Sequence, residues 1–355
     1  MVHLGRLAVG GAGIIFGEET AIEAIGRKTY SCAGLWNDSH VPRYRRLTDM
    51  MRSHGAVPAI QLGHSGRQAS CHHPDQNFKP LTDADAKGGS PPWQGVTPSA
   101  PEQIPRHYLP KVMDLDDIRT MLGTWREATQ RSVDAGFDII EIHGAHGYLI
   151  HQFLSPISNR RNDAYGGDRD GRMRFALEVA ETVRAAWPDE KPLFFRVSAL
   201  DGEGGQWNLE DTVALSAELK DRGIDVIDCS SGGVYGESDM PVVPYTAEVR
   251  AAFAERIKRK TGIMTMAVGG ITNPLEAEDI LQKEKADLVA LAREFLWNAD
   301  WAAHAAKMLG VSDSFGLMPY EYAFRLRGRD KQNEIPINQG GDETQAAYAK
   351  IFGTD

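Results

Sequence analysis

The stretch Asp138-Ile139-Ile140-Glu141-Ile142-His143-Gly144-Ala145-His146-Gly147-Tyr148 decides the fold. It begins with a short and nearly continuous apolar run, which is typical of a strand buried on both faces of a parallel sheet. Glycines and polar residues come immediately after it, where such a strand would end. A parallel strand needs a crossover, usually a helix, to reach the next strand. This stretch therefore predicts one unit of a βα repeat.

Similar apolar runs recur along the chain, each followed by a helix-like segment. They are Ile14–Phe16, Val57–Leu62, Leu193–Val197, Val226–Asp228, Met264–Val268 and Leu288–Leu291. Helix starts are marked by Asn208 and by Asn273-Pro274, and glycines mark helix ends at positions 55, 136, 223 and 262. The repeat predicts an α/β fold, a (β/α)₈ TIM barrel. A doubly wound sheet is the alternative, but such sheets rarely have this many consecutive parallel strands.

Seven strands are readable, so we expect the first strand of the barrel to be missing. The sequence opens on a helix pattern at about His3 to Val9, and a barrel requires a strand before that helix. We therefore expect an open seam between the strands at Ile14 and Leu288. The glycines at 10–13 are expected to form a turn and not a dinucleotide loop, because a helix precedes them and a strand comes after them.

The domain organisation is predicted to be simple. Residues 1–310 form one barrel, residues 68–111 form a capping insertion after the strand at 57–62, and residues 311–355 form a C-terminal extension. The insertion is long and rich in proline and glycine, and we expect it to shape substrate choice.

Composition excludes several classes of partner. The net charge of −10 argues against binding nucleic acid or anionic membranes. We find no apolar run long enough to span a membrane and no secretory signal at the start. The three cysteines are too few and too scattered for a disulfide framework, so we expect a cytoplasmic protein.

Polar residues stand where nearly every predicted strand ends, which is where a barrel of this kind carries its active site. Gln61, His143 and Arg196 lie at three of these ends, and His146 and Tyr148 come shortly after His143. The last two strands lead to Gly269-Gly270 and to Ala292-Arg293. Glycine turns and a helix start beside an arginine favour a phosphate-bearing ligand there.

The histidine pair allows three interpretations from the residues alone. It could be a loop of satisfied polar side chains. It could be a metal site, as in a lyase barrel, but this needs a third ligand, and we expect Glu141 to point to the opposite face from His143. It could also be a pair of neutral imidazoles that stabilise negative charge on one carbonyl oxygen, with Tyr148 as a proton donor.

The motif from His143 to Pro156, with Ser158-Asn159-Arg160-Arg161 and Tyr165-Gly166-Gly167, resembles the Old Yellow Enzyme family of NADH:flavin oxidoreductases. The bacterial NADPH-dependent ene-reductase branch is the most similar. The likeness runs from Val2 to about Asn298, and the stretches 61–67 and 291–296 are further anchors.

The resemblance implies FMN as a bound cofactor, with NADPH or NADH as co-substrate. His143 and His146 would hold the carbonyl oxygen of an α,β-unsaturated substrate, and Tyr148 would protonate its α-carbon. Gln61 and Arg196 would contact the flavin ring. The phosphate would be bound by the residues of the last two strand ends, Gly269, Gly270, Ala292 and Arg293.

Two departures from the family pattern stand out. Glu19 replaces a usual alanine, and a carboxylate there would lie against the flavin and disfavour its anionic reduced form. Ala292 replaces a usual glycine beside Arg293. We expect an FMN-dependent reductase of activated alkenes that works on small molecules, either as a monomer or as a homo-oligomer. A truncated or degenerate barrel without FMN, and a metal-dependent lyase barrel, are the alternatives.

Overall fold

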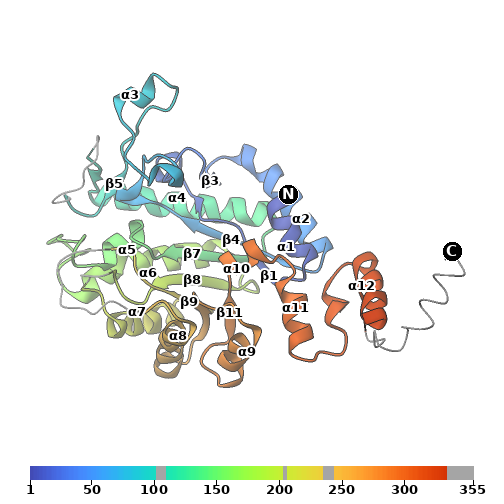
Figure 1. Ribbon diagram of the computed structural model, residues 1–355. Coiled ribbons are helices and arrows are strands. Elements are labelled where there is room, and N and C mark those ends of the chain that lie inside the picture. The colour runs from blue at the N-terminus through green and yellow to red at the C-terminus, as the bar shows by residue number, and fades with distance from the viewer. Residues whose placement is uncertain (101–108, 203–205, 235–243, 334–355) are drawn as a thin grey trace, which may run out of the picture.

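A computed structural model describes residues 1–100, 109–202, 206–234 and 244–333 (Figure 1). A nine-stranded sheet forms its centre, and every strand pairing in it is parallel. The strands are β1 (Ile14–Phe16), β2 (Thr20–Ala21), β3 (Ala33–Gly34), β4 (Val57–Gly63), β7 (Ile139–Gly144), β8 (Leu193–Ser198), β9 (Val226–Ser230), β10 (Met264–Val268) and β11 (Leu288–Ala290).

The sheet runs in the order β11-β10-β9-β8-β7-β4, and β4 then pairs with two short strands in succession. β1 lies beside the start of β4, at Val57–Ala59, and β2 lies beside its end, at Leu62–Gly63. The seven strands expected from the apolar runs are all present. β2 and β3 were not predicted, because two-residue strands have no periodicity that a sequence can reveal.

The sheet curls around a common interior. The rings of Phe16 in β1 and Phe194 in β8 lie 5.9 Å apart, although β4 and β7 separate their strands. Three strand spacings in a flat sheet would amount to about 14 Å. Ile14 of β1 and Leu288 of β11 pack on the same interior cluster. Within the described ranges, however, β1 and β11 do not pair with each other, so a gap in the pairing, the seam, separates the two ends of a curled, parallel α/β sheet.

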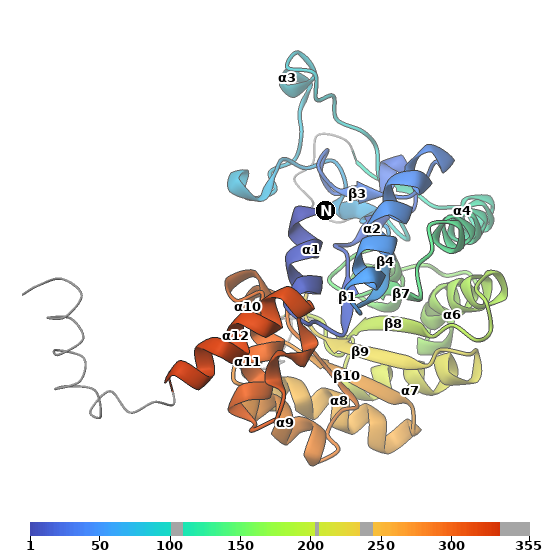
Figure 2. The same ribbon diagram turned by 90° about the vertical axis from the view of Figure 1, so that its right-hand side faces the viewer.

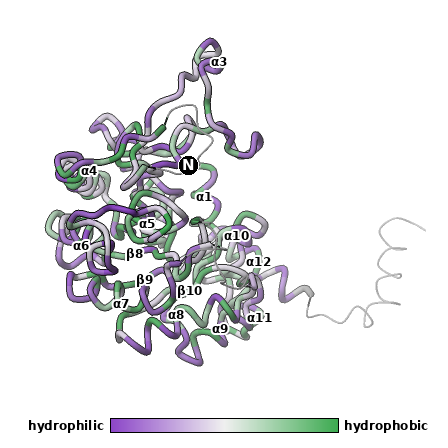
Figure 3. Tube along the Cα trace, turned by 90° about the vertical axis from the view of Figure 1, so that its left-hand side faces the viewer, coloured by the Kyte–Doolittle hydropathy of each residue, from purple (hydrophilic) through white to green (hydrophobic). Residues whose placement is uncertain are grey.

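Both faces of the central strands are buried, as their continuous apolar sequence predicts. Residues such as Ala59, Ile139 and Phe194 face the interior, and the alternate residues, such as Ile140 and Phe195, pack against the surrounding helices. Figure 3 shows hydrophobic residues along the central strands, whereas the outward turns of α7 and α9 are largely hydrophilic.

The helices pack on the outside of the sheet (Figure 2). They are α1 (Val2–Val9), α2 (Val41–Ser53), α4 (Leu115–Asp134), α5 (Leu149–Leu154), α6 (Arg169–Ala186), α7 (Leu209–Asp221), α8 (Ala247–Thr261), α9 (Pro274–Gln282), α10 (Arg293–Trp297) and α11 (Trp301–Met308). Asn208 and Asn273 cap α7 and α9 as predicted. The four predicted helix-ending glycines all have positive φ, a backbone conformation that favours glycine. α1 ends at Val9 and β1 begins at Ile14, so the intervening glycines form a turn between helix and strand.

The segment after β4 extends away from the sheet, as Figure 2 shows for α3 (Asp83–Ala86). It also contributes the small two-stranded sheet of β5 (Val96–Thr97) and β6 (Lys111–Val112). Part of the predicted insertion, residues 101–108, lies outside the described residues. At the other end, α12 (Tyr320–Asn333) comes after the barrel. Among the described helices, none has the length and apolar character needed to cross a membrane.

Candidate active site

The interior of the sheet changes from apolar to charged toward the ends of the strands. Gln61, Glu141, Arg196 and Asp228 each stand two residues beyond an inward-facing apolar residue of β4, β7, β8 and β9. A strand has a side-chain period of two, so all four point inward. The Gln61 amide donates to the Glu141 carboxylate at 2.6 Å, and Arg196 Nε lies 3.2 Å from Asp228 Oδ2. Glu141 therefore shares the face of His143, and the expectation that it points to the opposite face is wrong.

These four residues place two carboxyl groups and one guanidinium in a nearly dry interior. Burial, and then the proximity of Asp228, raise the pKa of Glu141 well above its usual value. Burial also raises the pKa of Asp228, against the attraction of Arg196. Burial alone would lower the pKa of Arg196, but the two acidic side chains raise it. Arg196 is therefore a stable cation near the end of β8, at the position for which the family resemblance implied a contact with the flavin.

His143, His146 and Tyr148 lie one layer further out, at the end of β7. The ring centroid of His143 is 5.1 Å from that of His146 and 5.0 Å from that of Tyr148. His146 Nε2 lies 2.7 Å from Ser230 Oγ at the end of β9, and its backbone N–H donates to Ser198 Oγ at the end of β8. The predicted constellation is therefore assembled, and two serines that were not predicted hold it.

The surroundings keep both imidazoles neutral. Burial, together with the neighbouring His146 and Arg196, lowers the pKa of His143 well below its usual value. Burial, and then the charge of Arg196, lower the pKa of His146 to about 3. In the part of the chain that the structure describes, His143 Nδ1 is buried without a hydrogen-bond partner. A neutral imidazole carries one N–H donor, so the pair can present donors without charge.

Tyr148 and Glu19 form the acidic side of the site. Burial, and then the proximity of Glu19, raise the pKa of Tyr148 above its usual value, which keeps its hydroxyl protonated. Burial raises the pKa of Glu19 to about 8, although Lys28 counteracts part of this effect. Glu19 Oε1 is buried and has no hydrogen-bond partner among the described residues. Its carboxyl group packs so closely on Gly63 that a Cβ at that position would collide with it.

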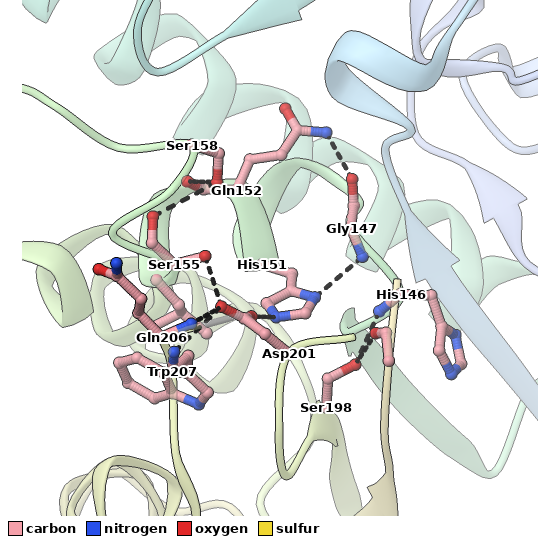
Figure 4. A network of polar contacts seen from close by, with 12 residues as sticks. His146, Gly147, His151, Gln152, Ser155, Ser158, Ser198, Asp201, Gln206 and Trp207 are labelled. Carbon is pink, nitrogen blue, oxygen red and sulfur yellow. Dashed lines mark hydrogen bonds and ion pairs between the residues drawn. The ribbon is translucent and has the colours of Figure 1, made fainter. Parts of the chain in front are cut away.

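A buried network fixes the turn that carries His146 and Tyr148 (Figure 4). The N–H of Gly147 donates to His151 Nδ1 at 2.9 Å, and His151 Nε2 lies 2.7 Å from Asp201 Oδ1. Ser155 donates to the other oxygen of Asp201, and so do two backbone N–H groups, of Gln206 and Trp207. His146 and Gly147 both have positive φ, which is rare for a residue such as histidine, so the network holds a strained turn.

The predicted phosphate-binding residues also lie at strand ends. Gly269 and Gly270, which come directly after β10, have φ of +106° and +73°. Arg293 begins α10, and its guanidinium donates to the Tyr245 hydroxyl at 2.7 Å. Ala292 is the residue before that helix and has a negative φ, so alanine fits there as well as the glycine usual in the family.

A continuous series of contacts connects the histidine pair with Arg293. His146 contacts Ser230, and the neighbouring Ser231 is bonded to Arg250 of α8. Arg250 and Arg293 both lie over the ring of Tyr245. Within the described ranges, no group of three or more His, Cys, Asp and Glu side chains is placed to hold a metal ion. The lyase alternative therefore finds no third ligand there.

Several residues of the site escaped prediction. The residues at the strand ends could be found from the sequence, but their partners from other segments could not, namely Ser198, Ser230, His151, Asp201, Tyr245 and Arg250. Two further residues of the site, Glu141 and Asp228, could have been found from the sequence. Each is an acidic residue within an apolar run, and a buried acidic residue needs polar partners, which the inward side of the sheet provides.

Comparison with known proteins shows which family shares these features. Residues 3–311 match the model of the NADH:flavin oxidoreductase / NADH oxidase family. A protein of Geobacillus sp. (strain WCH70) named NADPH dehydrogenase is 40% identical over 325 residues, which is 92% of this chain and 88% of that protein. A protein of the same name from Listeria innocua is 39% identical over 308 residues, 87% of this chain and 83% of that protein.

Solved structures give the same fold. The old yellow enzyme homologue from Zymomonas mobilis superposes with a TM-score of 0.68 at 23% identity, and covers 87% of this chain and 82% of its own. Morphinone reductase in complex with tetrahydroNAD superposes with a TM-score of 0.67 at 24% identity, again over 87% and 82%. At such identities the likeness speaks for the fold alone.

Proposed function

Because this chain belongs to the NADH:flavin oxidoreductase / NADH oxidase family, we propose that it reduces the C=C bond of α,β-unsaturated carbonyl compounds. The family confirms the expectation of an NAD(P)H-dependent flavin oxidoreductase with FMN as its cofactor, and it confirms the resemblance to Old Yellow Enzyme. The choice of an activated alkene as substrate rests on one observation. A buried imidazole, a half-buried imidazole, both neutral, and a protonated tyrosine meet at the end of β7.

The residues present fit an FMN group. Arg196 is a largely buried cation whose Nε forms an ion pair with Asp228 at 3.2 Å but no hydrogen bond among the described residues, and Gln61, which bonds Glu141, lies in the same interior. Gly269 and Gly270 offer backbone N–H groups without side chains, and Gly269 borders the Tyr245 hydroxyl that accepts a hydrogen bond from Arg293. We infer that Gln61 and Arg196 contact the flavin ring, with Glu19 at its edge, and that the residues around Arg293 hold the phosphate. Bound there, FMN supplies the hydride that the reduction requires.

The side chains of the chain itself then act on the substrate. N–H donors of His143 and His146 bind the carbonyl oxygen and stabilise the negative charge that develops on it. Two neutral imidazoles suit this role, because each donates a hydrogen bond without adding a positive charge next to Arg196. Tyr148 delivers a proton to the α-carbon, which its raised pKa permits because the hydroxyl keeps its proton until the carbanion forms.

The substitution Tyr148→Phe tests this assignment. We expect the reoxidation of the reduced protein by an enone to slow by about a hundredfold or more, since general acid catalysis contributes on that scale. Reduction of the oxidised protein by NADPH needs no such proton, so its rate should stay within about threefold of wild type. Stopped-flow absorbance monitors both half-reactions separately.

Tyr165→Phe is the matched control, because Tyr165 bonds Glu178 on the outer side of the barrel and lies away from the histidine pair. It should leave both half-reactions unchanged. Equal losses in the two half-reactions of Tyr148→Phe would contradict the proton-donor role. A folded wild-type protein without flavin absorbance would instead support the degenerate barrel.

A further inference from the structure

Lys28 places an ammonium group beside the proposed proton donor. It lies in the segment that connects β2 and β3, and its Nζ is 5.8 Å from the centroid of the Tyr148 ring. The same nitrogen is 4.0 Å from the centroid of the Phe78 ring, in the segment after β4. The positive charge therefore lies between the turn after β7 and the insertion that the sequence predicted to shape substrate choice.

Both ends of Lys28 are held in place. Its Nζ donates to Gln68 Oε1 at 3.2 Å, and Gln68 Nε2 donates to the backbone carbonyls of His146 and Gly147, each at 2.9 Å. The backbone carbonyl of Lys28 accepts from the N–H of Cys71 at 2.8 Å. Gln68 thus joins the ammonium directly to the turn after β7, so the position of the charge is fixed relative to the catalytic residues.

The charge of Lys28 acts on other groups of the site. Burial is the main cause of the lowered pKa of His146, and Lys28 adds to it. Burial raises the pKa of Glu19 to about 8, although Lys28 counteracts part of this effect. Glu19 is therefore largely uncharged at neutral pH and does not neutralise the ammonium. An anionic group that a substrate brings to this place is attracted, because charges interact strongly where little water separates them.

We propose that Lys28 binds a carboxylate carried by a short substituent on the α-carbon of the substrate. Tyr148 is assigned to protonate the α-carbon, so a substituent of that carbon can reach the ammonium that lies across its ring. An ammonium and a carboxylate form charge-assisted hydrogen bonds. The pyrophosphate of NADPH is also anionic, but a ribose separates it from the reacting ring. This inference rests on the proposed reduction of C=C bonds and narrows it to acidic substrates.

Two esters of itaconic acid test the proposal, because they share one C=C bond and differ in one charge. The 1-monomethyl ester has a free carboxylate on the CH₂ group attached to the α-carbon, and the dimethyl ester has none. Stopped-flow absorbance measures how fast each ester reoxidises the reduced, full-length holoenzyme. We expect wild type to prefer the monoester. Lys28→Met should slow the reaction with the monoester about tenfold or more and leave the diester unchanged, since a charge-assisted hydrogen bond is lost.

Lys87→Met is the matched control, because it removes the same charge from an exposed position in the insertion, and it should change neither rate. Lys28→Arg keeps a positive charge and should retain the preference for the monoester. The ratio of the two rates within one variant does not depend on the fraction of folded protein, so partial misfolding of Lys28→Met leaves the test valid. Isothermal titration calorimetry with the two saturated products should show the same loss of preference in Kd, without turnover.

Equal losses with both esters would indicate a merely structural role of Lys28 and overturn the proposal. Slower flavin reduction by NADPH with an unchanged ratio of the esters would assign Lys28 to the nucleotide, which also overturns it. A wild-type protein that reduces a simple enone but reacts no faster with the monoester than with the diester would refute this inference alone. A holoenzyme that neither the esters nor an enone reoxidises would contradict the proposed function itself.

Discussion

Burial is the main influence on the protonation states of the histidine pair and the tyrosine in the site. His143 and His146 lose their charge, and Tyr148 keeps its proton, because the sheet interior disfavours the ionised form of each. Arg196 is the exception, since Asp228 and Glu141 sustain its charge. The result is a cluster of neutral donors beside one fixed cation, which suits an enzyme that must stabilise transient negative charge.

Glu19 gives a prediction at this scale, because its pKa is raised to about 8 by burial. The pKa of this carboxyl group is higher in the folded protein than in the unfolded chain, where it is near 4.5. The free energy of unfolding therefore falls as pH rises from the unfolded pKa to the folded pKa. Glu19→Gln removes this loss. The free energy of unfolding of the variant, relative to wild type, should therefore rise between about pH 5 and pH 9, by at most about 4 kcal/mol. Urea denaturation at several pH values across this range measures it.

Glu18→Gln is the control for this experiment, because Glu18 is exposed next to Glu19 and should show no comparable pH trend. A constant difference between Glu19→Gln and wild type across the whole range would mean that Glu19 titrates as an ordinary surface carboxylate. Its proximity to Tyr148 would then leave the hydroxyl facing a full negative charge at neutral pH.

Residue identity was easier to predict than residue environment. His143, His146, Tyr148, Gln61 and Arg196 could be found because they lie at the ends of recognisable strands. Glu141 was placed on the wrong face, although its even spacing from His143 along the strand puts the two on one side. Neutral imidazoles were only one of three interpretations of the sequence, because the pKa values depend on burial and on charges that the fold brings from other strands.

At the scale of elements, the turn after β7 depends on a residue of the segment after β8. Asp201 accepts bonds from His151 and Ser155 and from two backbone N–H groups, and His151 in turn accepts from Gly147. Burial would raise the pKa of Asp201, but the bonds from His151 and its neighbours lower it overall. The carboxylate therefore contributes stability above its unfolded pKa, near 3.8, and this contribution is lost as pH falls through the lower folded pKa.

Asp201→Asn should test this dependence. The amide cannot accept every bond that the carboxylate accepts, so we expect the free energy of unfolding at neutral pH to fall by about 3 kcal/mol. We also expect a larger loss in kcat with an enone than in flavin reduction, because the turn positions His146 and Tyr148. Asp170→Asn, at an exposed position on α6, should change neither quantity. A stable variant with unaltered half-reactions would show that the turn keeps its shape without the carboxylate.

Element boundaries could be predicted wherever the signal lies within the element itself. The apolar runs marked seven strands, and asparagine caps and glycines marked helix ends. β2, β3, β5 and β6 were missed because each has two residues and exists only through pairing with distant segments. The Asp201 network was missed for the same reason, since the fold joins His151 to a carboxylate that lies beyond the next strand of the chain.

Across the whole molecule, the barrel interior divides into an apolar part and a polar part. The apolar residues at the starts of the strands form one cluster, with contributions from both β1 and β11. Beyond them come the charged residues around Arg196 and then the histidine pair. The acidic side chains of β7 and β9, which lie on this packed interior, therefore orient Gln61 and Arg196.

The seam gives the last prediction. Among the described strands, β11 pairs on one side only, with β10, and its residues are partly exposed, whereas β7 and β8 have partners on both sides and are almost entirely buried. Amides of an edge strand open more easily than those of a central strand. Native-state hydrogen exchange measured by mass spectrometry should show fast exchange in β11 and β1 and slow exchange in β7 and β8. Adding FMN should slow exchange next to Gly269 and Arg293 most, because ligands stabilise the elements that they contact. Equal protection of β11 and β8 in the flavin-free protein would show instead that the seam is covered in solution.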